Sequence, residues 1–218
     1  MEKAILRTLA YADVFEYPLT KEEIWRWLVS EDRKQKTKNR KEFAHSFKSN
    51  LNSRKIRVTD GFYYLKGRRR IVTLRKKRER WSQQKFKIAR RVASWLRFTP
   101  WVKLIGVTGA LAMANSDQED DIDLLIITSR DRLWLCRGLI VCLLRLTRLY
   151  RRPGKIKNRI CPNMLLDEKH LAMPKKERDL FSAHEVCQMK PLWEKGRTYQ
   201  RFLKANQWSK EFLPNWKP

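Results

Sequence analysis

Residues 107–128 decide the fold, and they read VTGALAMANSDQEDDIDLLIIT. Two runs of residues typical of buried strands are found here. The first extends from Val102 to Val107 and ends where this stretch begins, and the second extends from Leu124 to Ile127 near its end. Between these runs, Gly109 interrupts the first strand, Ala110 to Ala114 contain strong helix formers, and an acid-rich turn follows. The stretch therefore predicts a strand, a short helix, and a second buried strand with acidic residues at its start.

The sequence after this stretch continues the alternation of helices and strands. A helix is expected from about Asp131 to Tyr150, followed by a loop rich in Arg and Lys and by a third strand-like run from Ile160 to Leu166. Pro174 suits the first turn of another helix and Pro191 its end, and a last helix is expected from about Thr198 to Phe212. The pattern predicts an α/β (α+β) chain with a small sheet and a helical tail.

The first 66 residues are expected to form three helices closed by a β-hairpin. Thr20 and Glu23 have the spacing of a capping box at the start of the second helix. The dipeptide Asp60-Gly61 is a favoured two-residue turn between two strand-like runs. This order of elements resembles a winged helix-turn-helix, a family in which the third helix usually enters a major groove of DNA. The other interpretation is that the module only packs against a neighbour or dimerises.

Basic side chains suggest where a nucleic acid would bind. The third expected helix carries Arg40, Lys41 and Lys48 on the face opposite its apolar residues, and Arg69 and Arg70 follow the hairpin. The stretch from residue 66 to residue 91 contains thirteen basic residues and a single acid, and its apolar residues keep helical spacing. We expect a long connector helix whose charges point outward, and they either follow a phosphate backbone or form a solvated face.

Composition limits the classes of function. The net charge of +27 makes RNA or DNA the leading partner, with a solvated basic face or contact with anionic lipid as the other interpretations. The four cysteines form no CxxC pair, so a zinc site is not expected, and they are typical of buried residues in a reducing, cytoplasmic compartment. No signal peptide is recognised, and three arginines interrupt the most apolar stretch, so no membrane span is expected. Composition leaves the oligomeric state open.

The acidic residues at the start of the second strand are the candidates for chemistry. Alternate side chains of a strand share a face, so Asp121 and Asp123 are expected to point the same way, about 6 to 7 Å apart along the backbone. Two carboxylates together with triphosphate oxygens suit Mg²⁺, or Mn²⁺ in its place. Gly109 would let the backbone approach a phosphate. The other interpretation is that these acids only cap a turn.

The arrangement of residues 107–128 resembles the DNA polymerase beta superfamily of nucleotidyltransferases. The family pattern is a Gly-Ser turn, a spacer and Asp-hydrophobic-Asp, so the resemblance implies that Gly109 binds phosphate and that Asp121 and Asp123 bind metal. Ala110 stands at the nucleotide-binding position where the family has serine. The family also uses a third catalytic carboxylate on a later strand, for which Asp167 is the candidate.

The resemblance implies a division of the chain and a function. The order of the segments is similar to that of uncharacterised bacterial nucleotidyltransferase domain proteins. The resemblance implies transfer of a nucleoside monophosphate from a nucleoside triphosphate to a hydroxyl group, and the basic surface makes nucleic acid the favoured acceptor. The alternative is a winged-helix regulator or scaffold whose degenerate nucleotidyltransferase fold only senses a nucleotide. The expected segments are a winged helix at 1–66, a basic connector helix at 67–100, a nucleotidyltransferase-like core with a mixed sheet at 101–170, and a helical tail packed on that core at 171–218.

Overall fold

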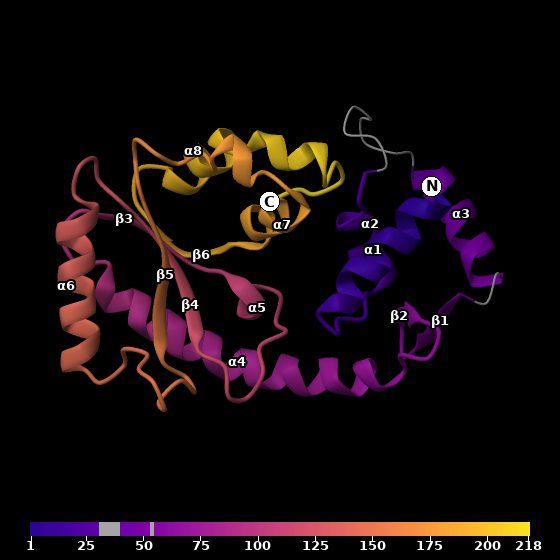
Figure 1. Cartoon of the computed structure of the whole chain (residues 1–218), viewed down its shortest axis with the longest axis horizontal. Helices are drawn as coiled ribbons and strands as arrows, with labels where there is room; N and C mark the ends of the chain where they lie inside the picture. The colour runs from indigo at the N-terminus through magenta and orange to yellow at the C-terminus, as the bar shows by residue number, and fades with distance from the viewer. Residues whose placement is uncertain (31–39, 53–54) are drawn as a thin grey trace. The chain divides into compact units, whose positions relative to one another are not determined.

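The computed structural model of the chain describes residues 1–30, 40–52 and 55–218. These residues form two compact units, which Figure 1 shows as ribbons. The first unit contains Met1–Lys77, Arg178–Cys187 and Trp208–Pro218, and the second contains Arg78–Glu177 and Gln188–Gln207. Segments that the sequence places in one C-terminal tail therefore contribute to both units.

The second unit is built around a four-stranded mixed sheet. The strands are β3 (Val102–Val107), β4 (Ile122–Thr128), β5 (Ile160–Asp167) and β6 (Lys190–Glu194), in the order β5-β4-β3-β6. Strands β4 and β5 run parallel, whereas β3 is antiparallel to both β4 and β6. The mixed sheet with flanking helices confirms the expected α/β (α+β) fold class.

Strand β6 is the element of this sheet that the sequence did not predict. Pro191 suggested only the end of a helix, but it lies in β6, which pairs with β3 alone at the edge of the sheet. An edge strand tolerates proline because one side of it needs no ladder hydrogen bond. Residues from the expected tail therefore complete the sheet that carries the candidate site.

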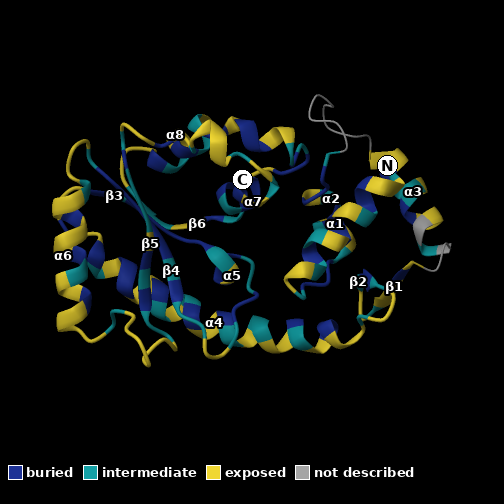
Figure 2. Ribbon diagram, viewed as in Figure 1, coloured by how far each residue is buried: buried dark blue, intermediate teal, exposed yellow. Residues whose placement is uncertain are grey.

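Two helices cover one face of this sheet. They are α4 (Arg70–Leu96), of which the second unit contains the part from Arg78 onward, and α6 (Leu133–Leu146). Both contribute to the core cluster that contains Ile122, Leu124 and Ile126 of β4. Figure 2 shows this core in dark blue. Because side chains alternate along a strand, Asp123 points to the opposite face of the sheet.

The remaining helices of the second unit are short. Helix α5 (Gly109–Ala112) follows β3, a 3₁₀ turn covers Lys175–Glu177, and α8 (Thr198–Ala205) contacts β3 and β6.

Helix α6 is mostly exposed and leaves large apolar side chains such as Trp134 and Leu146 in solvent. None of the helices formed by the described residues is both long enough and apolar enough to cross a membrane.

The first unit has the expected order of elements. It contains α1 (Glu2–Val14), α2 (Lys21–Arg26), α3 (Arg40–Asn52), and a hairpin of β1 (Ile56–Thr59) and β2 (Phe62–Leu65). It also contains most of α7 (Leu180–Gln188) and a 3₁₀ helix at Gln207–Glu211. The assignment of this module as a winged helix stays a prediction.

The capping box at the start of α2 is present and is tied to α4. Thr20 Oγ1 accepts a hydrogen bond from the Glu23 amide at 3.2 Å, and Glu23 Oε2 accepts one from the Thr20 amide at 2.8 Å. The buried Arg75 guanidinium donates to both carboxylate oxygens of Glu23, at 2.8 and 3.0 Å. A two-pronged contact of this kind fixes orientation as well as charge, so it secures α2 against α4.

The charges of α4 do not all point outward, contrary to the expectation from the sequence. Lys85 is 1% exposed, and Arg75 is also buried. Burial lowers the pKa of Lys85, and the nearby acids Asp120 and Asp121 oppose that shift. A buried ammonium group needs hydrogen-bond acceptors around it, and for Lys85 these acceptors belong to the loops before β4 and β5.

Candidate metal and nucleotide site

The start of β4 brings three potential metal ligands together. Carboxylate oxygens of Asp121 and Asp123 and the Sγ atom of Cys161 all lie within 4.8 Å of one another. Asp121 directly precedes β4, Asp123 lies in it, and Cys161 is the residue of β5 that pairs with Asp123. The structure therefore brings the two predicted metal-binding aspartates together and adds a cysteine.

The pKa of Asp123 shows how strongly this environment disfavours a second negative charge. Burial and the negative charge of Asp121 raise the Asp123 pKa to about 6, although the Cys161 thiol and the Arg151 guanidinium oppose the shift. Burial also raises the pKa of the Cys161 thiol. Two adjacent, partly buried carboxylates are stabilised in their charged forms by a cation.

Arg151 already supplies positive charge to this cluster. Its Nε atom lies 3.2 Å from Asp121 Oδ2, and its Nη1 atom lies 3.9 Å from Cys161 Sγ. The backbone places it there, because the Arg151 amide donates to the Ile160 carbonyl at the start of β5, at 3.1 Å. Asp121 Oδ2 is buried yet makes no hydrogen bond to the described residues, so Arg151 contacts it as an ion pair only.

Gly109 lies directly beside Asp123. Its φ of +62° is in the left-handed region, and an added Cβ atom would lie 3.0 Å from Asp123 Oδ2. The Thr108 amide donates to the Asp123 carbonyl at 3.1 Å, which fixes the start of α5 next to β4. Ala110 is exposed in the first turn of α5. Of the two positions predicted to bind the nucleotide, Gly109 therefore lies beside Asp123, and Ala110 follows it in α5.

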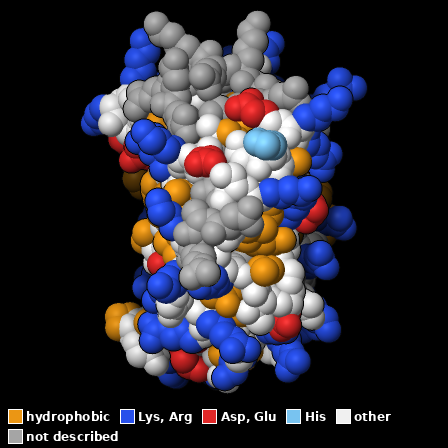
Figure 3. Space-filling model, turned by 90° about the vertical axis from the view of Figure 1, so that its right-hand side faces the viewer, with side chains coloured by type: hydrophobic (Ala, Val, Ile, Leu, Met, Phe, Trp, Pro, Cys, Tyr) orange, Lys and Arg blue, Asp and Glu red, His pale blue; other side chains and the backbone are white. Residues whose placement is uncertain are grey.

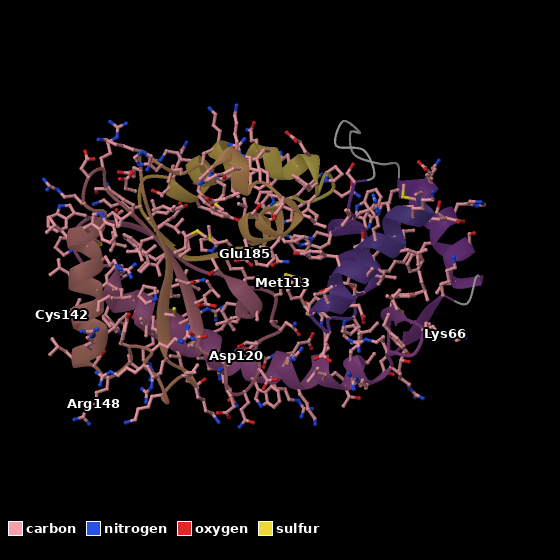
Figure 4. All side chains as sticks on the ribbon, viewed as in Figure 1. Lys66, Met113, Asp120, Cys142, Arg148 and Glu185 are labelled. Carbon is pink, nitrogen blue, oxygen red and sulfur yellow. The ribbon has the colours of Figure 1, made fainter. Side chains whose placement is uncertain are left out.

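Helix α4 stabilises the turn before Asp121 through the side chain of Lys85. Lys85 Nζ donates to the carbonyl oxygens of Gln118 and Asp120, at 3.2 and 2.5 Å, and to Asn158 Oδ1 at 3.0 Å. The Asp120 carboxylate accepts a hydrogen bond from the Asp117 amide at 2.6 Å and so stabilises this turn. Figure 4 labels Asp120 in this turn. Lys85 thus links the segment before β4 to the loop before β5.

Asp167 is not close to the other two predicted catalytic residues. The sheet register pairs it with Thr128, five residues along β4 from Asp123 and therefore roughly 16 Å away. Its carboxylate accepts hydrogen bonds from the amides of Lys169 and His170 at 2.8 and 3.2 Å. Because β4 and β5 are parallel, a residue at the end of β5 cannot reach the start of β4. The prediction that Asp167 is the third carboxylate is wrong in its geometry.

The sequence reasoning missed Cys161 as a member of the site. The cysteine stands one residue after the start of β5, and a parallel pairing of the two apolar runs in register would have placed it beside Asp123. Composition alone gave no direction or register for the third strand. The parallel register is therefore the missing piece of information.

The five residues predicted to bind nucleic acid belong to the first unit and lie on its surface. Arg40, Lys41 and Lys48 are exposed on α3, and Arg69 and Arg70 are exposed before and at the start of α4. The side-chain Nη2 of Arg70 lies 3.6 Å from Glu16 Oε1. Figure 3 shows Lys and Arg side chains distributed over a face of the molecule. Their exposure makes these side chains accessible to a polyanion, and a role in binding one stays a prediction.

Comparison with known proteins gives limited similarity. No protein-family model and no curated protein matches the sequence. Solved structures resemble part of the fold, and the first is a proposed nucleotidyltransferase from Sulfolobus solfataricus, which is 15% identical over 56% of this chain and 90% of that chain, with a TM-score of 0.35. A toxin–antitoxin structure with AMP-PNP is 17% identical over 53% of this chain and 82% of that chain, with a TM-score of 0.31.

The toxin–antitoxin MntA-HepT is also similar. It is 16% identical over 57% of this chain and 80% of that chain, with a TM-score of 0.24. At these TM-scores the likenesses carry no inference about activity, and a function for this chain has to be derived from its own site.

Proposed function

We propose that this chain binds a nucleoside triphosphate with Mg²⁺ or Mn²⁺ and transfers the nucleoside monophosphate to a hydroxyl group. The observation that carries the proposal is the convergence of Asp121 and Asp123 at the start of β4, directly beside the left-handed Gly109. Carboxylates for a metal and a backbone that approaches a phosphate are the two requirements of a metal–nucleotide site. The start of β4 brings residues suited to both roles together, which supports the proposal.

The residues present fit a divalent cation. Asp121 Oδ2 is a buried carboxylate oxygen without a hydrogen bond to the described residues, and burial together with the Asp121 charge raises the pKa of Asp123. Oxygen ligands of this kind suit Mg²⁺ and Mn²⁺. When bound, the cation would hold triphosphate oxygens and neutralise charge on the departing pyrophosphate.

The chain's own residues would position the nucleotide. Gly109 leaves room next to Asp123 Oδ2 that a side chain would fill, and the first amides of α5 have no capping bond from the Thr108 side chain. Free amides at the start of a helix can donate to phosphate oxygens. With Ala110 in place of serine, a side-chain hydroxyl is missing at that position, so nucleotide affinity would depend on the backbone and the metal.

Activation of the acceptor hydroxyl is the weak point of this site. The third potential ligand among the described residues is Cys161 and not a carboxylate, and Asp167 lies at the other end of β5. A carboxylate that accepts the hydroxyl proton contributes strongly to such reactions. We therefore propose slow transfer, with the proton leaving to solvent.

A nucleic acid is the acceptor that the charge of the chain favours. The net charge is +27, and the candidate contacts Arg40, Lys41 and Lys48 are exposed on one helix. Phosphate contacts of this type give affinity without sequence specificity. A terminal ribose or deoxyribose hydroxyl would then be the nucleophile.

Transfer of a radioactive label tests the proposal. The purified chain is incubated with α-labelled ATP, CTP, GTP or UTP, Mg²⁺ or Mn²⁺, and total RNA. We expect metal-dependent label in RNA that disappears in the double variant Asp121→Asn/Asp123→Asn. The matched control is Asp131→Asn, because Asp131 is exposed and paired with Lys169 on the surface. Label transfer that survives in the double variant would overturn the proposal.

A second candidate function is a nucleic-acid-binding regulator whose site senses a nucleotide without transferring it. The observations that favour it are Cys161 in place of a third carboxylate and the contact of Arg151 with Asp121. This candidate predicts binding to duplex DNA or RNA with a steep salt dependence. Replacing Arg40, Lys41 and Lys48 with glutamine would weaken that binding and reduce the salt slope, whereas the double aspartate variant would leave it unchanged.

A further inference from the structure

Cys161 has a place in the site that neither the motif of residues 107–128 nor the proposed reaction assigns. We infer that Cys161 is the third ligand of the cation and that its sulfur makes the site select Mn²⁺ over Mg²⁺. The inference rests on the proposed function, because it takes Asp121 and Asp123 as metal ligands. It adds a ligand and a choice of metal to that function.

The sheet places the sulfur of Cys161 beside the two carboxylates, at the position of a third ligand. Cys161 pairs with Asp123 across the parallel strands β4 and β5, and its Sγ lies within 4.8 Å of the ligand oxygens of both aspartates. Ligand atoms of one ion, each at about 2.0 to 2.6 Å from it, lie at most about 5 Å apart. The three atoms can therefore share one ion with little movement of the backbone.

A cationic group already contacts two of these three ligands. The Arg151 guanidinium approaches Asp121 Oδ2 at 3.2 Å and Cys161 Sγ at 3.9 Å. The Arg151 side chain is 47% exposed, so it can move into solvent when a cation enters. The cluster of ligand atoms therefore stabilises a positive charge, and Cys161 Sγ is one of the atoms that contact it.

The chemistry of sulfur determines the metal. Mg²⁺ is a hard cation that prefers oxygen ligands and keeps its waters. Divalent transition metals, Mn²⁺ among them, accept a thiolate ligand more readily than Mg²⁺ does. A thiol that binds a metal loses its proton, so binding at Cys161 releases one proton to solvent and forms one metal–sulfur bond. A site with two carboxylates and one thiolate would therefore bind Mn²⁺ more tightly than Mg²⁺ and would bind the softer Cd²⁺ through its sulfur.

Cadmium binding tests whether the sulfur is a ligand. Cys142 is exposed and would also react with Cd²⁺, so the full-length Cys142→Ser variant serves as the parent, while Cys136 and Cys187 are buried. Titration with Cd²⁺ is expected to produce the ultraviolet sulfur-to-cadmium charge-transfer band with one equivalent bound. The band should be absent after the additional change Cys161→Ser, which keeps the size of the side chain. A band of equal strength in Cys161→Ser would overturn the inference.

Competition between Mn²⁺ and Mg²⁺ tests the choice of metal. Binding of Mn²⁺ is followed by its paramagnetic resonance signal, and Mg²⁺ is added as competitor. We expect the parent to prefer Mn²⁺ by at least about tenfold, and we expect Cys161→Ser to lower Mn²⁺ affinity by about tenfold. Cys161→Asp should reduce the preference by tightening Mg²⁺ binding. An unchanged Mn²⁺-to-Mg²⁺ ratio in both variants would contradict the inference.

These measurements separate a failure of the inference from a failure of the proposed function. If Mn²⁺ and Mg²⁺ bind, and binding is lost in Asp121→Asn/Asp123→Asn but is insensitive to residue 161, the metal site stands and the role of Cys161 is wrong. If no divalent cation binds to the folded chain with or without ATP, both are wrong. Circular dichroism of each variant confirms that it is folded before its binding is interpreted.

Discussion

The Nε atom of Arg151 lies 3.2 Å from Oδ2 of Asp121, a buried carboxylate oxygen that makes no hydrogen bond to the described residues. The guanidinium and a metal ion would therefore compete for the same oxygen. Half of the Arg151 side chain is exposed, which weakens the ion pair through solvent screening. Arg151 can serve as a replaceable counter-charge that keeps the two aspartates compatible when no metal is bound.

Replacing Arg151 with methionine should tighten the binding of a free divalent cation. The change removes the competing positive charge and keeps much of the apolar length of the side chain. Because the pair is partly exposed, we expect a gain of about two- to tenfold at low salt and a smaller gain at high salt. Equilibrium titration with Mn²⁺ in the absence of nucleotide measures it. Arg152→Met, at the neighbouring exposed residue, is the matched control, and an equal gain in that control would contradict a specific role for Arg151.

The raised pKa of Asp123 predicts how stability depends on pH. Its pKa is about 6 in the folded chain against an ordinary value of 3.8, so the folded state holds a proton over this interval and loses stability as pH rises through it. Asp123→Asn should therefore raise the free energy of unfolding at about pH 8, and this gain should vanish as pH falls through 6 toward 3.8. Urea unfolding at a series of pH values checks it, and a gain that is constant with pH would contradict the assigned pKa.

Gly109→Ala should destabilise the chain and weaken metal binding. The residue has a φ of +62°, and its new Cβ atom would lie 3.0 Å from Asp123 Oδ2. The left-handed conformation alone costs about 1 to 2 kcal/mol for a residue with a Cβ atom. Gly138→Ala is the matched control, because Gly138 lies in α6 with no atom near its would-be Cβ, and it should stabilise the chain by about 1 kcal/mol. Thermal unfolding and Mn²⁺ titration compare the two variants, and effects of the same sign would contradict the account.

Lys85→Met should destabilise the second unit and loosen the site. The change leaves the carbonyl oxygens of Gln118 and Asp120 without the donor that reaches them from α4. Loss of a buried donor costs about 1 to 3 kcal/mol through the acceptors left behind. The exposed residue Lys87 of the same helix gives the control Lys87→Met, which should change stability by less than about 0.5 kcal/mol. If urea unfolding finds the two variants equally stable, Lys85 does not hold the turn.

The local elements of this chain could be predicted from the sequence because local rules specify them. The capping box of Thr20 and Glu23, the turn at Asp60-Gly61, and the strands on either side of Gly109 each depend on neighbours within a few residues. The convergence of the Asp121 and Asp123 carboxylates was predicted from the alternation of side chains along a strand, although Asp121 itself directly precedes β4. These predictions needed no knowledge of how distant segments meet.

The features that the sequence did not predict depend on long-range pairing. The partner of Asp123 is set by the parallel register of β4 and β5, which brings Cys161 and not Asp167 to the site. In the sequence, Pro191 indicated only the end of a helix. A strand tolerates this proline because β6 lies at the edge of the sheet. Lys85 resembled one more solvated charge until the acceptors from residues 118, 120 and 158 were known.

Binding of ATP with and without a divalent cation tests the central claim most directly. Isothermal titration of the full chain with a non-hydrolysable ATP analogue is run with Mn²⁺, with Mg²⁺, and with EDTA, and is repeated for Asp121→Asn/Asp123→Asn and for Asp131→Asn. The account predicts one nucleotide per chain, dependence on the cation, and a loss of at least about tenfold in affinity in the double variant only. Nucleotide binding that is equally tight with EDTA, or that survives in the double variant, would contradict a metal–nucleotide site at Asp121 and Asp123.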